Sequence, residues 1–248
     1  MNSHNKQFKQ TLNARRFWFA SGLVLPSNAE SEPVRFGLLN WALCAQTMGV
    51  ILKYLYEIDK IDTINNVKYV SDTIIKRLYS SFDSIDAESK VVEETAYQNS
   101  AKSFDPETMD ETHGLEEAFH EGVSHYLIHT HMKQEFLNSS ITWLFHQFER
   151  DCTRIFQTED GNTKKSKLTT LNVDTSPNSK WKICNSELRD LANAIKHGEG
   201  KSLNRLKSAQ PNLFKSGTNQ IEVKVTDVER YTKALLDFWT DFFNAAIR

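Results

Sequence analysis

Three polar residues in the last quarter of the chain have the types and spacing that phosphate chemistry requires. Arg189, Asn193 and His197 recur at four-residue intervals, which places them along one side of a helix. An arginine can hold a phosphate with two parallel hydrogen bonds, and a histidine can exchange protons near neutral pH. The row therefore suits the handling of a phosphate group. The simpler alternative is the solvated polar edge of a core helix.

The adjoining side of the same helix predicts how the row is positioned. Its apolar residues have helical spacing: Leu188, Leu191, Ala192 and Ile195. We expect this stripe to lie in a core and to leave the polar row at the rim. Gly198 and Gly200 directly follow and are expected to end the helix.

The composition is that of an ordinary globular protein. The chain has 248 residues, of which 39% are hydrophobic and 25% are charged, so it is long enough to fold without a metal ion or disulfides. Cys44, Cys152 and Cys184 are odd in number and show no CxxC spacing, which predicts buried thiols in a reducing, cytoplasmic compartment. The uncharged run from Phe36 to Leu52 contains polar residues and glycines, so we expect a buried core helix and no membrane span.

Charge is unevenly distributed along the chain. Residues 83 to 135 hold 13 acids and 3 bases, a net charge of −10, whereas residues 161 to 215 hold 11 bases and 4 acids, a net charge of +7. The basic stretch contains the polar row and suits nucleic-acid phosphate, although a solvated basic face is the alternative. The lysines expected to attract an RNA backbone are Lys164, Lys165, Lys196 and Lys201. The acidic stretch is a candidate surface for a protein partner.

Periodicity and punctuation predict a mainly α fold, a helical bundle with at most one short strand or hairpin near residues 213 to 225. Helices are expected at Leu12–Phe19, Phe36–Tyr56, Thr63–Phe82 and Glu88–Lys102, with breaks that include Asp62 and residues 83 to 86. Capping boxes at Thr108–Glu111 and Thr226–Glu229 predict two further helix starts. Apolar faces predict helices through 141–156, through 181–195 from a start near Ser176–Pro177, and from Val228 to the end.

The remaining segments complete the expected organisation. Gln157 to Lys180 is polar with little apolar patterning and is expected to be a long loop, and Ile221 to Val225 alternates as a short strand does. The predicted division is an N-terminal helical region at 1–105, an acidic, histidine-rich helix at 106–137 and a helical domain at 138–248.

Five histidines crowd one segment: His113, His120, His125, His129 and His131. Glu121, His125 and His129 align at four-residue steps, as metal ligands on a helix do. However, His120-Glu121 followed by His125 has HExxxH spacing, which does not bring two histidines to one face as zincin motifs do. We therefore predict that the protein binds no metal ion and no cofactor. A metal-dependent enzyme that uses the histidines between 113 and 131 is the third class of function.

The order of motifs after residue 138 resembles HEPN domains. A helix with Trp143-Leu-Phe-His-Gln-Phe-Glu149 is followed by a polar loop and then by Trp181 leading into Leu188-Arg-Asp-Leu-Ala-Asn-Ala-Ile-Lys-His-Gly198. The family motif is an arginine, a polar residue and then a histidine, with four to six residues between arginine and histidine. His197 and Asn193 match this motif, whereas Ala192 stands in the arginine position and Arg189 is the nearest substitute.

The resemblance implies a function as well as a fold. It implies a metal-independent endoribonuclease or RNA-binding protein of a bacterial defence or toxin–antitoxin system, acting as a homodimer with one composite site. In that site His197 would transfer protons, Arg189 would stabilise the phosphate, and Asn193 would orient either group. The alternative is a catalytically inactive helical subunit that assembles with, or regulates, a multi-protein complex.

Overall fold

The computed structural model describes residues 32–108 and 110–247, with the side chains of residues 32–46 and of Glu111 left out. It separates into two compact units, Met1–Ile51 and Leu52–Arg248. The helix expected at Leu12–Phe19 lies outside the described residues. The description below concerns the second unit unless residues of the first are named.

The described chain is mainly α-helical, as the sequence predicts. The long helices are α2 (Glu32–Ser71), α3 (Ile85–Lys102), α4 (Glu111–Phe156) and α9 (Val225–Ile247). The shorter ones are α5 (Gly161–Thr170), α6 (Lys180–Lys182), α7 (Arg189–His197) and α8 (Lys201–Ala209). Wide π-helical turns at Asp72–Leu78 and Ile183–Leu188 and 3-10 turns at Tyr79–Phe82 and Pro211–Leu213 join some of them. The strand expected at 221–225 is reduced to one antiparallel bridge between Phe214 and Ile221.

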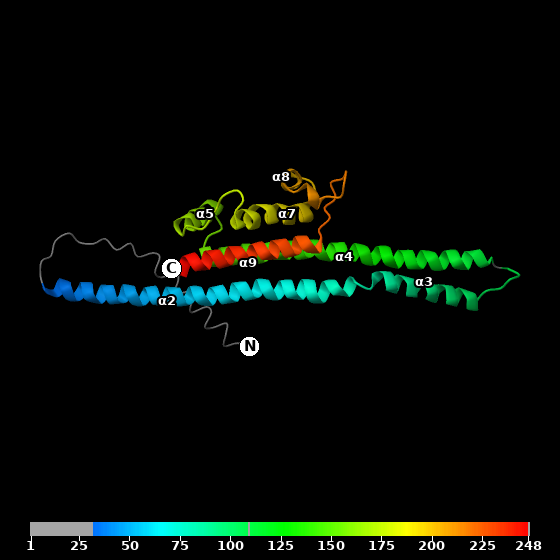
Figure 1. The fold of residues 1–248 in the computed structure, drawn as a ribbon, viewed down its shortest axis with the longest axis horizontal. Helices are drawn as coiled ribbons and strands as arrows, with labels where there is room; N and C mark the ends of the chain where they lie inside the picture. The colour runs from blue at the N-terminus through cyan, green and yellow to red at the C-terminus, as the bar shows by residue number, and fades with distance from the viewer. Residues whose placement is uncertain (1–31, 109, 248) are drawn as a thin grey trace. The chain divides into compact units, whose positions relative to one another are not determined.

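The core forms where α9 packs against the second half of α4 and against the helical run from α6 to α7 (Figure 1). The predicted apolar faces are confirmed: Ile141, Phe148, Cys152, Val228, Tyr231, Leu235, Phe238 and Trp239 are each at most 2% exposed. Aromatic rings dominate the centre, where Phe238 lies 4.9 Å from Trp239 and 5.5 Å from Trp181 between ring centroids. Such rings bury large apolar areas and fix the relative positions of the helices.

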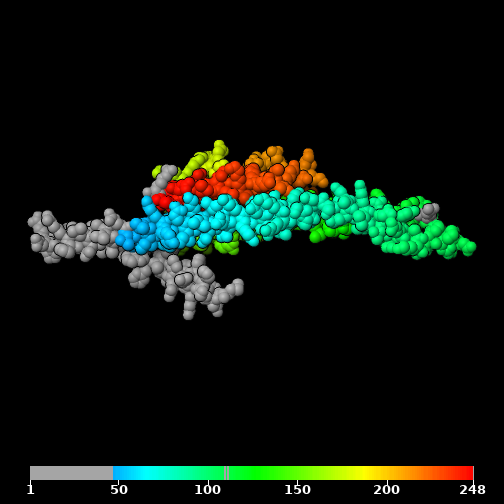
Figure 2. Space-filling model, turned by 60° about the horizontal axis from the view of Figure 1, so that its bottom comes forward, coloured from blue at the N-terminus to red at the C-terminus, as the bar shows by residue number. Residues whose placement is uncertain are grey.

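The later part of α2 lies beside α9 (Figure 2), and an ion pair joins it to α4. Tyr56 packs edge-on against Phe242 with ring centroids 6.4 Å apart. Arg154 of α4 donates to Asp59 at 2.6 Å and to the hydroxyl of Thr63 at 2.9 Å, and both of these α2 residues are buried. A buried carboxylate needs such a partner to offset its desolvation, so the pairing fixes α2 against α4.

Two predictions of secondary structure are wrong, the helix break at Asp62 and the loop at Gln157 to Lys180. The break expected at Asp62 lies inside α2, where Asp62 is exposed. α4 runs through residues 137 and 138, where two of the predicted regions meet, and residues 52–248 form one compact unit. The segment expected as a loop, Gln157 to Lys180, contains α5, whose Leu168 is fully buried.

The helix starts show which side chains cap them. α4 begins one residue after Asp110, whose carboxylate accepts from the N–H of Thr112, so the cap is Asp110 and not Thr108. α9 begins at Val225, and Asp227 accepts from the N–H of Lys224. The helical run expected to begin near Ser176–Pro177 begins at Lys180, with Ser179 as its cap.

The cysteine prediction is confirmed for two of the three residues. Cys152 and Cys184 are 2% and 0% exposed. Burial raises the pKa of both thiols, which disfavours the reactive thiolate. The side chain of Cys44 lies outside the described residues.

The apolar run from Phe36 to Leu52 does not form the buried helix that we expected in the part whose side chains are described. Met48, Val50, Ile51 and Leu52 are between 42% and 69% exposed. Among the described residues, no helix combines the length and apolar character needed to span a bilayer.

Candidate nucleic-acid interface

The helix that carries the polar row has a buried side and an exposed side, as its periodicity predicts. Leu188, Leu191, Ala192 and Ala194 are at most 3% exposed. On the other side, Arg189, Lys196 and His197 are exposed and Asn193 is half-buried. Ile195, expected in the buried stripe, is only partly buried. We call Arg189, Asn193, Lys196 and His197 the α7 row.

A glycine-rich corner ends α7 directly after His197. Gly198 has φ 67° and Gly200 has φ 149°, both in the range that L side chains rarely adopt. The N–H of Gly198 still donates to the carbonyl of Ala194 at 2.9 Å, which closes the last turn. The chain then turns into α8 at Lys201. The predicted helix end is therefore confirmed, and His197 occupies the exposed last turn of α7.

The base of α7 is fixed by a carboxylate in the preceding π-helical turn. Glu187 accepts from Arg230 at 2.6 Å, from the hydroxyl of Tyr231 at 2.7 Å and from the amide of Gln210 at 3.2 Å. Tyr231 is fully buried. Its burial raises the pKa of its hydroxyl, and the negative charge of Glu187 raises that pKa further, so the hydroxyl stays protonated and donates to Glu187. These contacts join α9 and the 3-10 turn to the start of α7 and give the α7 row a rigid support.

Asp190, the residue after Arg189, belongs to a different contact. It is 7% exposed and accepts two hydrogen bonds from Arg205 of α8, at 2.8 Å and 2.5 Å. Such a two-pronged pair fixes the orientation of both groups. Asp190 is therefore engaged in holding α8 against α7 and is not a free acid beside the α7 row.

This pair leads to a prediction about acid. Burial raises the pKa of Asp190, but the hydrogen bonds and charge of Arg205 outweigh that effect and hold the pKa below its ordinary value. The stabilisation should be complete above about pH 4, the usual pKa of an unfolded aspartate, and be lost as pH falls through the lower folded value. Asp190→Asn should thus unfold at lower urea than wild type at pH 7, and the gap should narrow below about pH 4.

Urea unfolding at pH 7, 4 and 3 checks this expectation. Glu199→Gln is the matched control, because Glu199 is an exposed acid beyond the end of the same helix. A gap between wild type and Asp190→Asn that stays constant from pH 7 to pH 3 would contradict the role given to Asp190.

The structure brings α4 to the α7 row and adds a histidine that we did not predict as a site residue. The ammonium of Lys196 lies 3.4 Å from Nε2 of His146, whose Nδ1 lies 3.6 Å from Glu149. The His146 side chain is 47% exposed, and Trp143, one turn earlier, is 41% exposed. In the sequence, Trp143 and His146 could have been recognised as exposed because their helical spacing differs from that of the buried Phe145 and Phe148. Only the packing of α4 on α7 shows that His146 lies next to Lys196 of the α7 row.

The predicted lysines differ in their access to solvent. Lys165, Lys196 and Lys201 are exposed, whereas Lys164 is only 7% exposed. The difference in exposure between Lys164 and Lys165 could not be predicted from a loop, because a loop has no regular buried side. In α5, Lys164 lies four residues before Leu168 and shares its inward face.

Ala192 determines how the HEPN-like motif can be interpreted. The position where that motif places its arginine is 1% exposed and faces the core. Arg189 lies one helical turn earlier and is exposed. An arginine could therefore serve the surface from position 189 but not from position 192.

The chain matches no family model, and searches of curated proteins and of solved structures found no significant match. The interpretation of the α7 row accordingly depends on its own residues and their surroundings.

Proposed function

We propose that this chain binds RNA with the α7 row and the facing side of α4, and that it cleaves RNA there without a metal ion. The observation that carries the proposal is the exposure of Arg189, Lys196 and His197 on one side of a helix whose other side packs in the core through Leu191, Ala192 and Ala194. His146 adds a second histidine to the same surface, next to Lys196. Two imidazoles can act as the base and the acid in metal-independent phosphodiester cleavage, and two cations can stabilise the charge on the phosphate.

The chemistry follows from the types of side chain. One imidazole takes the proton of a ribose 2′-hydroxyl, and the oxygen then attacks the adjacent phosphorus. The P–O bond to the next nucleotide breaks, and its 5′ oxygen receives a proton from the second imidazole. Arg189 and Lys196 stabilise the charge that develops on the phosphate oxygens. The products are a 2′,3′-cyclic phosphate and a free 5′-hydroxyl.

We place this activity in the context that the HEPN resemblance implies. The protein would act in the cytoplasm as a homodimer in bacterial defence or in a toxin–antitoxin pair, with the α7 rows of the two copies facing a common cleft. The half-buried Asn193 would orient the phosphate or an imidazole. The exposed Lys165 and Lys201 would extend the contact along the RNA backbone, which should make binding weaken steeply with salt.

Cleavage of RNA by the purified full-length chain tests the proposal. We expect wild type to cut total RNA in the presence of EDTA and to leave cyclic phosphate ends. His197→Ala and Arg189→Ala should each reduce the rate by about 100-fold or more, since proton transfer and charge stabilisation contribute effects of that size. Both variants should keep their stability within about 1 kcal/mol, because both positions are exposed.

His131→Ala is the matched control, since His131 is an exposed histidine on α4 outside the candidate interface. It should cleave RNA at the wild-type rate. Wild-type cleavage that persists in His197→Ala would overturn the assignment of the site. A chain that neither binds nor cleaves RNA at low salt would overturn the proposed function.

The second candidate function is that of a non-catalytic subunit that binds a protein partner. It is favoured by a group of apolar side chains on the first half of α4 that are 42% to 60% exposed: Leu115, Phe119, Tyr126, Leu127, Ile128 and Met132. Exposed apolar groups of this kind often mark interaction surfaces. Because this segment lies in the acidic stretch, the partner would present a basic surface.

A further inference from the structure

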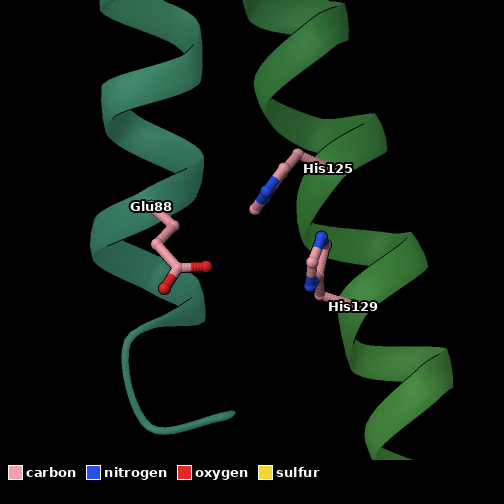
Figure 3. Close-up of side chains that lie close together, drawn as sticks. All are labelled: Glu88, His125 and His129. Carbon is pink, nitrogen blue, oxygen red and sulfur yellow. The ribbon is translucent and has the colours of Figure 1, made fainter. Parts of the chain in front are cut away.

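We propose that Glu88, His125 and His129 form a binding site for a divalent transition-metal ion such as Zn²⁺, which links α3 to α4. One ligand atom from each of these side chains lies within 4.8 Å of the other two. Figure 3 shows Glu88 projecting from one helix toward the two histidines of the other. The site shares no residue with the α7 row, so it stands or falls independently of the proposed function.

Small residues on α4 bring α3 close enough to complete the cluster. Gly114, Ala118 and Gly122 follow one another at four-residue intervals along the side of α4 that faces α3. A Cβ atom at Gly122 would lie 2.9 Å from Cβ of Glu93 and 3.2 Å from the carbonyl oxygen of Ser89, so only glycine fits there. His125 and His129 continue the same side of α4 and are half-buried against α3.

A hydrogen-bond chain prepares His125 for a metal ion. The buried hydroxyl of Ser89 donates to the carbonyl of Ile85 at 2.7 Å, so its oxygen is left to accept. Nδ1 of His125 lies 3.2 Å from this oxygen and therefore carries the proton in that contact. In the neutral tautomer with this contact, Nε2 is the nitrogen with a free lone pair, and it can bind a metal ion. Metal-bound histidines commonly donate their other N–H to a neighbouring acceptor in this way.

The other two side chains are also held near the ligand positions. The ring of His129 stacks on that of His125 with centroids 4.1 Å apart and planes inclined by 23°. The carboxylate of Glu88 accepts from the hydroxyl of Ser84 one turn earlier, which restrains one of its oxygens. Small side-chain rotations would bring the three ligand atoms to the roughly 2.0–2.2 Å that zinc requires.

The donor set selects the class of ion. Two imidazoles and a carboxylate suit zinc and its neighbours in the first transition series, whereas magnesium and calcium prefer oxygen ligands alone. Three protein ligands leave a fourth position for water. The surplus of acids between residues 83 and 135 would attract a cation to this part of the chain. The third ligand comes from α3 and not from Glu121, which the four-residue spacing had suggested.

Titration of the EDTA-treated full-length chain with ZnCl2 tests the site. We expect one Zn²⁺ per chain by calorimetry and by metal analysis after desalting, with a higher melting temperature. Each of His125→Ala, His129→Ala and Glu88→Gln should weaken binding at least tenfold. Ser89→Ala, which removes the partner of Nδ1 and the bond to the carbonyl of Ile85 but no metal ligand, should weaken it by about 10- to 100-fold.

His120→Ala and His131→Ala are the matched controls, because both remove an exposed histidine from the same helix. They should bind Zn²⁺ as wild type does, and circular dichroism should show all variants folded. Bound Zn²⁺ should also slow hydrogen exchange in α3, since it joins that helix to α4. Absence of binding by wild type, unchanged binding by His125→Ala and His129→Ala, or loss of binding in the controls would overturn the proposal.

Discussion

Ala192→Arg is expected to destabilise the protein strongly and not to create a more active ribonuclease. The substitution would restore the spacing of the HEPN motif by placing an arginine directly before Asn193. However, Ala192 is 1% exposed and lies on the side of α7 that packs in the core with Leu188 and Leu191. A long charged side chain there must displace packed neighbours and lose its hydration. We expect a loss of about 3–5 kcal/mol, comparable to leaving a buried charge without a partner.

Urea unfolding followed by circular dichroism measures this loss. Lys196→Arg is the control, because it introduces an arginine on the exposed side of the same helix. The control should unfold at the same urea concentration as wild type. A folded Ala192→Arg variant with faster RNA cleavage would show that an arginine at 192 reaches the surface, which would contradict the packing described for α7.

Leu188→Ala is expected to cost about 2–5 kcal/mol, the range typical of truncating a leucine in a packed core. Leu188 is 0% exposed at the junction between the π-helical turn and α7. Truncation leaves a cavity beneath the α7 row, because the helix cannot move inward while Glu187 holds its base to Arg230 and Tyr231. Helical spacing puts Ile195 in the same stripe, but that residue is only partly buried. Ile195→Ala should therefore cost clearly less.

Comparison of the two variants by urea unfolding checks this difference within one helix. Equal losses at both positions would contradict the difference in burial between Leu188 and Ile195. The comparison also calibrates the RNA experiment. A lower cleavage rate in His197→Ala can be assigned to the loss of the imidazole only if that variant is as stable as wild type. Leu188→Ala shows how much cleavage is lost through destabilisation alone.

Much of the fold is predictable because helical periodicity records which side of each helix is buried. The spacing of Phe148, Cys152, Phe238 and Trp239 is enough to identify the core sides of α4 and α9, and all four residues are buried. The glycines after His197 correctly mark the end of α7. These features depend on residues within a few positions of one another, which a local pattern can represent.

The errors concern segments where local and tertiary signals differ. α5 has a single deeply buried apolar residue, Leu168, so its periodicity is too weak to detect, although Asp160 caps it by accepting from the N–H of Thr163. α4 also continues through the polar residues 138–140, where the predicted third region begins. Ser140 there bonds back to the carbonyl of Phe136 within the helix, which satisfies its hydroxyl without ending the helix.

The sequence by itself determined that Arg189 and His197 lie on an exposed side of a helix whose opposite side is packed. Only the tertiary structure decided which side chains from other helices lie beside these residues and which neighbouring side chains are engaged in other contacts. It brought His146 to Lys196, engaged Asp190 with Arg205, and placed Glu88 beside His125 and His129. The physical reason is that helical spacing fixes which side of a helix a residue occupies. Contacts between separate helices depend instead on how those helices pack, which no single helix encodes.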